Sequence, residues 1–217
     1  LAPLLPPRPA AMKRAAATWV VVLLKDFGSA KQRLRPALDP TQRRELAVHN
    51  ARLALEAARA GDHVLAVCGG PEPAALARRA RVEVLLEEEP GGQNPAARRG
   101  LERAQSGGAG AVLLLSSDLP LVSQGAVRAM LAEARTLGDA AVLAAPATGR
   151  GGTNALYLRP PDAIGLHFGD DSLGKFARDA GARGVRFALH ESLALALDLD
   201  EPSDLAALAQ AGGAGLP

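Results

Sequence analysis

The chain has 217 residues, of which 48% are hydrophobic and 22% charged, with a formal net charge of +2. This balance is typical of one globular domain with a substantial core, and it excludes an intrinsically disordered chain. Because the chain has no long basic block and only 3% aromatic residues, it offers nucleic acid neither an electrostatic footprint nor a stacking platform. Its single cysteine, Cys68, excludes an internal disulfide and ends an apolar run, so we expect a buried, unreactive thiol in a reducing compartment.

Residues 1–17 are rich in alanine and proline and have no apolar periodicity. We expect them to be a disordered leader, with Met12 as a candidate natural start, ahead of a single domain over 18–217. No uninterrupted apolar run approaches the roughly 20 residues that a membrane span requires, and no cleavage site follows the first run. We therefore expect a cytoplasmic protein without a membrane or nucleic-acid partner. The sequence leaves the oligomeric state open, a homodimer included.

Short apolar runs alternate with longer helical patterns along the chain. Runs of strand length cover residues 18–24, 63–69, 82–86, 109–117, 139–146, 153–158, 184–189 and 193–200. Helical patterns cover residues 40–60, 73–80, 94–106, 123–137, 172–182 and 202–211. Because the clearest strands are near-continuous apolar runs, this alternation predicts a doubly wound, mostly parallel α/β sheet with helices on both faces. In such sheets ligands bind beyond the carboxyl ends of the strands.

Charged residues follow three of the expected strands. They are Lys25, Lys31 and Arg33 after the first strand, Asp118 after the strand at 109–117, and Asp198 with Asp200 at the end of the last. Taken singly, each charge marks the point where a buried strand meets water. Taken together at one sheet edge, they indicate a site for a metal-bound polyphosphate, because Mg²⁺ takes one or two carboxylates and completes its shell with phosphate oxygens and water. Lysines would neutralise the remaining phosphate charge.

Two glycine-containing segments add candidate anion sites. The stretch GRGGTNAL, 149–156, places Thr153 at the mouth of a strand, where the alternative is a simple hairpin turn. The stretch HFGDDS places Gly169 and Ser172 just before a helix. Ser172 could cap that helix, or the free helix N-terminus could bind an anion.

A third segment, EEEPGGQN, precedes the helix expected at 94–106. Gln93 and Asn94 could read a nucleobase edge or could cap the helix, and we expect the acidic run Glu87–Glu89 to be a solvated loop. The chain has neither the Walker A pattern nor the G-x-G-x-x-G fingerprint, so a P-loop enzyme and a Rossmann oxidoreductase are poorly supported.

The stretches VVLLKDFGSAKQRL, SSDLPLV, GRGGTNAL, HFGDDS and LDLDEPSDL, in this order and at these spacings, resemble the CofC/FbiD family over about residues 19–205. Members of this family are guanylyltransferases of coenzyme F420 biosynthesis that act on 2-phospho-L-lactate or phosphoenolpyruvate. The resemblance implies a fold like that of nucleotide-diphospho-sugar transferases. It also implies Mg²⁺, GTP and a small phosphorylated carboxylic acid as ligands.

The resemblance assigns roles position by position. It implies Lys25 and Lys31, joined by Arg33, for the nucleotide phosphates, Asn94 for the nucleotide, Asp118 and Asp198 for the metal, and Thr153, Gly169 and Ser172 for the acid. Lys25, Lys31 and Asp118 would be the catalytic residues. The sequence departs from related patterns at Ser116, where glycosyltransferases of similar fold carry the first acid of D-x-D, and at Phe176, near where several family members have histidine.

The implied reaction is an in-line displacement at the α-phosphorus of GTP. A phosphate monoester is already mostly dianionic at neutral pH, so no general base is needed. This suits a chain whose four histidines show neither metal-ligand spacing nor a serine or cysteine partner. Three alternatives stay open at this point: a molybdopterin guanylyltransferase, a glycosyltransferase of similar fold, and a non-enzymatic nucleotide-binding domain.

Overall fold

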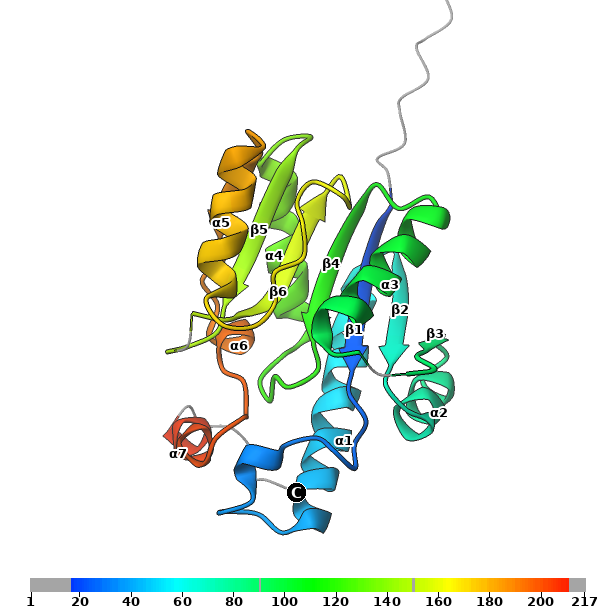
Figure 1. Ribbon diagram of the computed structural model, residues 1–217, viewed down its shortest axis with the longest axis vertical. Coiled ribbons are helices and arrows are strands. Elements are labelled where there is room, and N and C mark those ends of the chain that lie inside the picture. The colour runs from blue at the N-terminus through cyan, green and yellow to red at the C-terminus, as the bar shows by residue number, and fades with distance from the viewer. Residues whose placement is uncertain (1–16, 90, 150, 211–217) are drawn as a thin grey trace, which may run out of the picture.

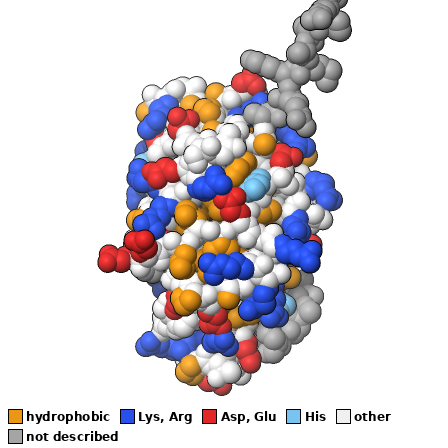
Figure 2. Space-filling model, turned by 90° about the vertical axis from the view of Figure 1, so that its right-hand side faces the viewer, with side chains coloured by type: hydrophobic (Ala, Val, Ile, Leu, Met, Phe, Trp, Pro, Cys, Tyr) orange, Lys and Arg blue, Asp and Glu red, His pale blue; other side chains and the backbone are white. Residues whose placement is uncertain are grey.

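The computed structural model describes residues 17–89, 91–149 and 151–210. Apart from Ala17, the leader expected over 1–17 lies outside the described residues. Among the described helices, none combines the length and the apolar character needed to cross a membrane. On the face shown in Figure 2, basic, acidic and hydrophobic side chains are interspersed over the coloured part.

Seven strands form one sheet in the order β3-β2-β1-β4-β6-β5-β7 (Figure 1). They are β1 (Thr18–Leu24), β2 (His63–Cys68), β3 (Glu83–Leu86), β4 (Ala111–Ser116), β5 (Ala141–Pro146), β6 (Thr153–Arg159) and β7 (Arg186–Leu189). Strand β6 runs antiparallel to β4 and β5, whereas the other neighbouring pairs are parallel. The mostly parallel sheet predicted from the sequence is confirmed.

Helices cover both faces of this sheet, as the sequence predicts (Figure 1). They are α1 (Pro40–Ala57), α2 (Pro71–Arg79), α3 (Gln93–Ser106), α4 (Gln124–Thr136), α5 (Ser172–Ala182), α6 (Leu193–Ala196) and α7 (Pro202–Gln210), with short 3-10 turns η1 (Gln32–Leu34) and η2 (Ala58–Ala60). Helix α1 begins at a capping box, in which the Asp39 side chain accepts from the Gln42 amide and the Gln42 side chain accepts from the Asp39 amide.

Alternate residues of the central strand β1 point into two separate cores. Val20 and Val22 pack with α1, α2 and α4, whereas Val21 and Leu23 pack with α3 and α5. Helix α3 approaches the sheet closely at Gly100, where an added Cβ would lie 2.5 Å from Cγ1 of Val21. The two cores fix the strand ends in position, and the functional side chains follow directly from those ends.

The strand expected over 193–200 is wrong. Residues 193–196 form the short helix α6, and the chain continues outside the sheet. The side-chain amide of Asn154, on β6, donates to the carbonyls of the last two residues of α6 at 3.0 and 3.1 Å. This contact satisfies backbone groups that a sheet would otherwise have paired. Asp198 therefore lies in an extended loop and not at a strand end.

Candidate active site

Two pockets adjoin at the carboxyl edge of the sheet. The first, here called the apolar pocket, lies beyond β3, β2, β1 and β4, and the second, the polar pocket, lies beyond β4 and β6. Four residues line both pockets: Lys25, Gln93, Ser116 and Asp118. A ligand in one pocket would therefore meet a ligand in the other at these side chains.

The apolar pocket has aliphatic walls and a few polar groups. The walls include Leu23, Leu24, Val67 and Ala96, and the polar groups include Glu87 and the residues shared with the polar pocket. Apolar walls with a few convergent polar groups are typical of sites for small organic molecules.

The polar pocket contains the predicted acid-binding residues together with the predicted metal ligands. Thr153, Gly169, Ser172, Asp198 and Asp200 all line it. The lining of this pocket also includes Lys25, so the structure brings together residues that are up to 175 positions apart in the sequence. Their convergence at the carboxyl edge is what the sequence predicts.

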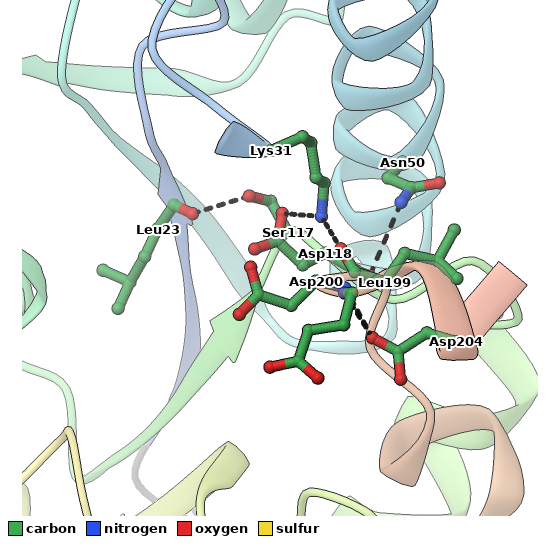
Figure 3. Close-up of polar contacts among 9 residues, drawn as sticks. Leu23, Lys31, Asn50, Ser117, Asp118, Leu199, Asp200 and Asp204 are labelled. Atoms are coloured by element: carbon green, nitrogen blue, oxygen red, sulfur yellow. Dashed lines mark hydrogen bonds and ion pairs between the residues drawn. The ribbon is translucent and has the colours of Figure 1, made fainter. Parts of the chain in front are cut away.

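Lys31 and Asp118 form an ion pair in the floor of the site. The ammonium nitrogen of Lys31 lies 2.8 Å from Oδ1 of Asp118 and donates to the Leu199 carbonyl at 2.6 Å (Figure 3). The Lys31 side chain is 1% exposed, whereas that of Asp118 is 24% exposed and still reaches both pockets. Lys31 is therefore buried behind Asp118, and it holds this carboxylate and the segment at Leu199 together.

The charge of Asp118 is maintained by two lysines. Burial alone would raise the pKa of Asp118, but the ammonium groups of Lys31 and Lys25 and the hydrogen bond from Lys31 outweigh it, so the pKa lies below its ordinary value. Asp118 is thus an anion at neutral pH. Unlike Lys31, Lys25 is exposed and lines both pockets.

Backbone contacts fix the loop that carries Asp118. The Leu199 amide donates to the Asp118 carbonyl at 3.1 Å, and the Ser117 hydroxyl donates to the Leu23 carbonyl at 2.9 Å (Figure 3). The side chain of Asn50, which is fully buried on α1, donates to the same Asp118 carbonyl at 3.5 Å. These contacts hold the loop to β1, to α1 and to the segment that follows α6.

Arg33 lies at the outer rim of the polar pocket. Its guanidinium contacts Asp200 at 2.8 Å and Glu201 at 3.9 Å. The side chain is 67% exposed, so this pair contributes little to stability. Arg33 nevertheless adds a cation to the side of the pocket that carries the aspartates.

The predicted acid-binding residues are in mutual contact. Ser172, 1% exposed, donates its hydroxyl proton to Oγ1 of Thr153 at 3.1 Å. Thr153 then has its own proton to donate to a ligand. The N-cap of α5 is Asp171 and not Ser172, which is the first residue of the helix. Gly169 has a φ of 118°, which favours glycine because it has no side chain.

Asn94 lies close to the two pockets, and its side chain bonds to the backbone of a neighbouring segment. The side-chain amide of Asn94 donates to the Phe168 carbonyl at 2.9 Å and accepts from the Phe168 amide at 2.8 Å. This reciprocal pair ties the start of α3 to the segment that carries Gly169. The neighbouring Gln93 lines both pockets, so the sequence reasoning singled out the adjacent amide.

The carboxylates of the polar pocket suit a hard divalent cation. Within the described ranges no cluster of three or more histidine, cysteine, aspartate or glutamate side chains forms a complete metal cage. Asp118 and Asp198 line the same pocket, and Mg²⁺ needs only one or two carboxylates when a phosphate supplies further oxygens. These two residues could therefore hold Mg²⁺ together with a bound phosphate.

Three histidines lie in carboxylate pairs. Each has a carboxylate oxygen within 2.9 Å: His63 with Glu83, His167 with Asp179, and His190 with Glu133. None of the four histidines lines the apolar or the polar pocket. Phe176 is fully buried and stacks edge-on against Phe168 at 5.3 Å between ring centroids, so it is a core residue of α5.

Sequence reasoning missed several residues of the site. Asn154 was visible in the G-G-T-N stretch, but its role depends on where the segment after α6 lies. Glu87 was assigned to a solvated loop, yet it is 9% exposed and lines the apolar pocket. Glu88 and Glu89 are exposed, as expected.

Known proteins similar in sequence match most of this chain. Residues 18–214 match a family model described as guanylyl transferase CofC like. The phosphoenolpyruvate guanylyltransferase of Rubrobacter xylanophilus is 40% identical over 196 residues, covering 90% of this chain and 95% of that protein. The 2-phospho-L-lactate guanylyltransferase of Methanothermobacter thermautotrophicus is 34% identical over 194 residues, covering 87% and 82%.

The fold also has a counterpart among solved structures. A protein of Desulfovibrio desulfuricans G20, assigned to the nucleotide-diphospho-sugar transferases, superposes with a TM-score of 0.71 at 16% identity, covering 91% of this chain and 88% of that one. At this identity the likeness concerns the fold alone, and it confirms the fold class predicted from the sequence. On the family match and the identity to curated guanylyltransferases, this chain belongs to the family of CofC-like guanylyl transferases.

Proposed function

We propose that this enzyme transfers GMP from GTP to the phosphate group of a small phosphorylated carboxylic acid, releases pyrophosphate, and acts in coenzyme F420 biosynthesis. The observation that carries the proposal is the junction of the two pockets at Lys25 and Asp118. Because one pocket suits a nucleoside and the other a small anion, the reacting phosphates would meet between these two side chains.

Phosphoenolpyruvate is the acceptor that we favour, with 2-phospho-L-lactate second. The phosphoenolpyruvate guanylyltransferase of Rubrobacter xylanophilus is 40% identical to this chain, whereas the 2-phospho-L-lactate enzyme of Methanothermobacter thermautotrophicus is 34% identical. Both acids carry a carboxylate beside a phosphate, and the hydroxyl pair of Thr153 and Ser172 can serve either.

The nucleotide would lie with its base and ribose in the apolar pocket. Its triphosphate would then lie at the shared residues, where the exposed ammonium group of Lys25 can contact phosphate oxygens. Lys25 would neutralise charge that develops on the departing pyrophosphate, and electrostatic stabilisation of this kind is usually the largest single term in catalysis.

The acceptor would lie in the polar pocket, with its phosphate directed at the α-phosphorus. An acceptor phosphate oxygen forms a bond to the α-phosphorus, while the bond from the α-phosphorus to the oxygen bridging to the β-phosphorus breaks. The electron pair leaves with pyrophosphate, and no proton has to be removed because the acceptor phosphate is a dianion. Thr153, Ser172 and the backbone at Gly169 would orient the acceptor, and such positioning can supply a large part of the rate.

The charges of the polar pocket favour a metal-dependent reaction. Its lining includes four aspartates, Asp118, Asp170, Asp198 and Asp200, against the two cations Lys25 and Arg33. Such a pocket would repel two polyanionic substrates. Mg²⁺ held by Asp118 and Asp198 would supply the missing positive charge and polarise the α-phosphate.

The test is an assay of pyrophosphate release from GTP with each of three acids: phosphoenolpyruvate, 2-phospho-L-lactate and 3-phosphoglycerate. We expect turnover with Mg²⁺ that stops when the metal is chelated and resumes when Mg²⁺ is added back. The Lys25→Ala variant should lower turnover about 100-fold. Absence of pyrophosphate release with all three acids would contradict the proposal.

A further inference from the structure

Glu87 is a buried acid at the far end of the apolar pocket. It directly follows β3, and its backbone amide donates to the Cys68 carbonyl at 2.9 Å, which continues the pairing of β2 with β3. The residue is 9% exposed, whereas the next two glutamates are exposed. Its side chain is therefore held inside the site by the sheet.

One of the two carboxylate oxygens of Glu87 accepts no hydrogen bond from the described residues. Its Oε1 atom is buried and has no hydrogen-bond partner within the part of the chain that the structure describes. The other oxygen, Oε2, lies beside Gly69, where an added Cβ would be in ordinary van der Waals contact with it at 3.6 Å. A buried acceptor left without a donor is costly, so the geometry favours a ligand that supplies N–H groups here.

The position of Glu87 suits contact with the base rather than with the phosphates. Asp118 follows β4 and Glu87 follows β3, and the order β4-β1-β2-β3 separates these strands by three spacings, about 14 Å in all. This is a span comparable to that from the base to the phosphates of a nucleotide. A carboxylate would repel phosphate, so the phosphates belong at the Lys25 end.

Guanine differs from the other bases in the donors that it offers a carboxylate. Its N1–H and its 2-amino group lie side by side and match the two oxygens of a carboxylate. Adenine presents an unprotonated N1 at the corresponding position, and two acceptors would face one another. Cytosine likewise presents an acceptor at N3, and uracil offers a single N–H between two carbonyls.

We propose that Glu87 reads the N1–H and 2-amino groups of guanine in the apolar pocket and thereby makes the enzyme selective for GTP. This inference rests on the proposed function, because it places the nucleotide in that pocket. It goes further by naming the residue that determines which nucleotide is used.

The experiment measures equilibrium binding of GTP, ITP, XTP and ATP, each with Mg²⁺ and without acceptor, to the wild type, to Glu87→Gln and to Glu88→Gln. In the wild type we expect GTP to bind about 10- to 100-fold more tightly than ATP, with ITP between them because it lacks the 2-amino group. In Glu87→Gln the new amide N–H faces the 2-amino group of GTP but can donate to the 2-carbonyl of XTP. XTP should therefore become the preferred purine nucleotide.

Glu88→Gln is the matched control, because the same substitution is made one residue on at an exposed position, and it should keep the order of the wild type. If Glu87 had a purely structural role, the Glu87→Gln variant would bind all four nucleotides more weakly by a similar factor and would have a lower melting temperature. That result, or unchanged preference for GTP over ATP in a folded Glu87→Gln protein, would overturn the inference.

The outcomes separate the two proposals. Tight GTP binding without pyrophosphate release from any of the three acids would contradict the proposed reaction while leaving the role of Glu87 supported by the binding order. Pyrophosphate release with equal use of GTP and ATP by the wild type would support the reaction and overturn the role of Glu87.

Discussion

The ammonium nitrogen of Lys31 lies 2.8 Å from Oδ1 of Asp118 and is enclosed by the carbonyl of Leu199. Lys25, six residues earlier, is exposed to both pockets. The two lysines, which the sequence presents as equivalent, therefore differ in role. Lys31 positions a carboxylate of the site from behind, and Lys25 is the cation that can touch a phosphate.

Replacing each lysine with methionine should separate these roles. Lys31→Met leaves a largely buried carboxylate without its partner and should lower the free energy of unfolding by about 3 kcal/mol. We expect the low end of the usual range because the Asp118 side chain is 24% exposed. Lys25→Met should change stability by less than about 0.5 kcal/mol and lower turnover about 100-fold.

Urea unfolding and pyrophosphate release provide the two measurements. Arg33→Met serves as the control for stability, because its pair with Asp200 is at the surface and should contribute less than about 1 kcal/mol. Equal destabilisation by the Lys25 and Lys31 variants would show that the burial of Lys31 has no energetic consequence.

Ser172→Ala should affect the acid more than the nucleotide. Loss of the hydroxyl removes the bond that orients Thr153, whose own proton is the one left to donate to the acid. We expect KM for the acid to rise about 5- to 10-fold, as for loss of one hydrogen bond of about 1 kcal/mol, with KM for GTP nearly unchanged. Ser106→Ala, at an exposed position on α3, is the matched control. A parallel rise in both KM values would instead indicate a general change in the site.

The thiol of Cys68 should be inert in the folded protein. Burial, opposed by Arg78 and assisted by Glu87, raises the pKa of Cys68 from 9.0 to about 12. At pH 8 a thiol with this raised pKa has about 1000-fold less thiolate than an ordinary cysteine, and only the thiolate reacts. A disulfide-exchange reagent should therefore label the native protein slowly and the urea-unfolded protein rapidly. Fast labelling of the native state would mean that β2 opens frequently at this end.

The free energy of unfolding should fall at acid pH because Asp179 becomes protonated. The hydrogen bond from His167, opposed by burial and supported by Arg183 and the Gly165 amide, lowers the pKa of Asp179 from 3.8 to about 2. Because the folded pKa is below the unfolded value, this carboxylate stabilises the fold fully above about pH 4. The stabilisation is lost as the pH falls from about 4 to about 2.

Unfolding free energies measured from pH 6 to pH 2 would test this. Asp179→Asn should be less stable than the wild type at pH 6 and should lose less stability across the acid window. The exposed Asp162→Asn should leave both the stability and its slope unchanged. If the unfolding free energy of Asp179→Asn fell as steeply between about pH 4 and pH 2 as that of the wild type, the pH dependence would come from other groups.

Much of the fold could be predicted because buried strands and amphipathic helices leave strong local patterns. The strand at 18–24 and the helix at 172–182 have the predicted bounds. The prediction of a strand over 193–200 was wrong because alternating leucine and alanine suit a strand and also a buried loop. The contact that decides between them comes from Asn154, some forty residues away, and a local pattern cannot contain it.

The candidate site was predictable as a set of residues but not as a set of roles. Lysine is seldom buried, so nothing in the sequence distinguishes Lys31 from Lys25. An acidic run usually faces water, so Glu87 could be separated from its two neighbours only by the sheet that encloses it. Asn94 was assigned to the nucleotide, and the contact that its side chain makes in the structure, with the backbone of Phe168, depends on tertiary structure.

The bond from Lys31 to the Leu199 carbonyl joins residues 168 positions apart. During synthesis, the amino-terminal strands emerge from the ribosome long before Leu199 does. A nascent chain therefore holds a lysine with an incomplete set of acceptors until the segment around Leu199 has emerged. Arrival of that segment, rather than pairing of the first strands, would be the moment at which the site is first complete.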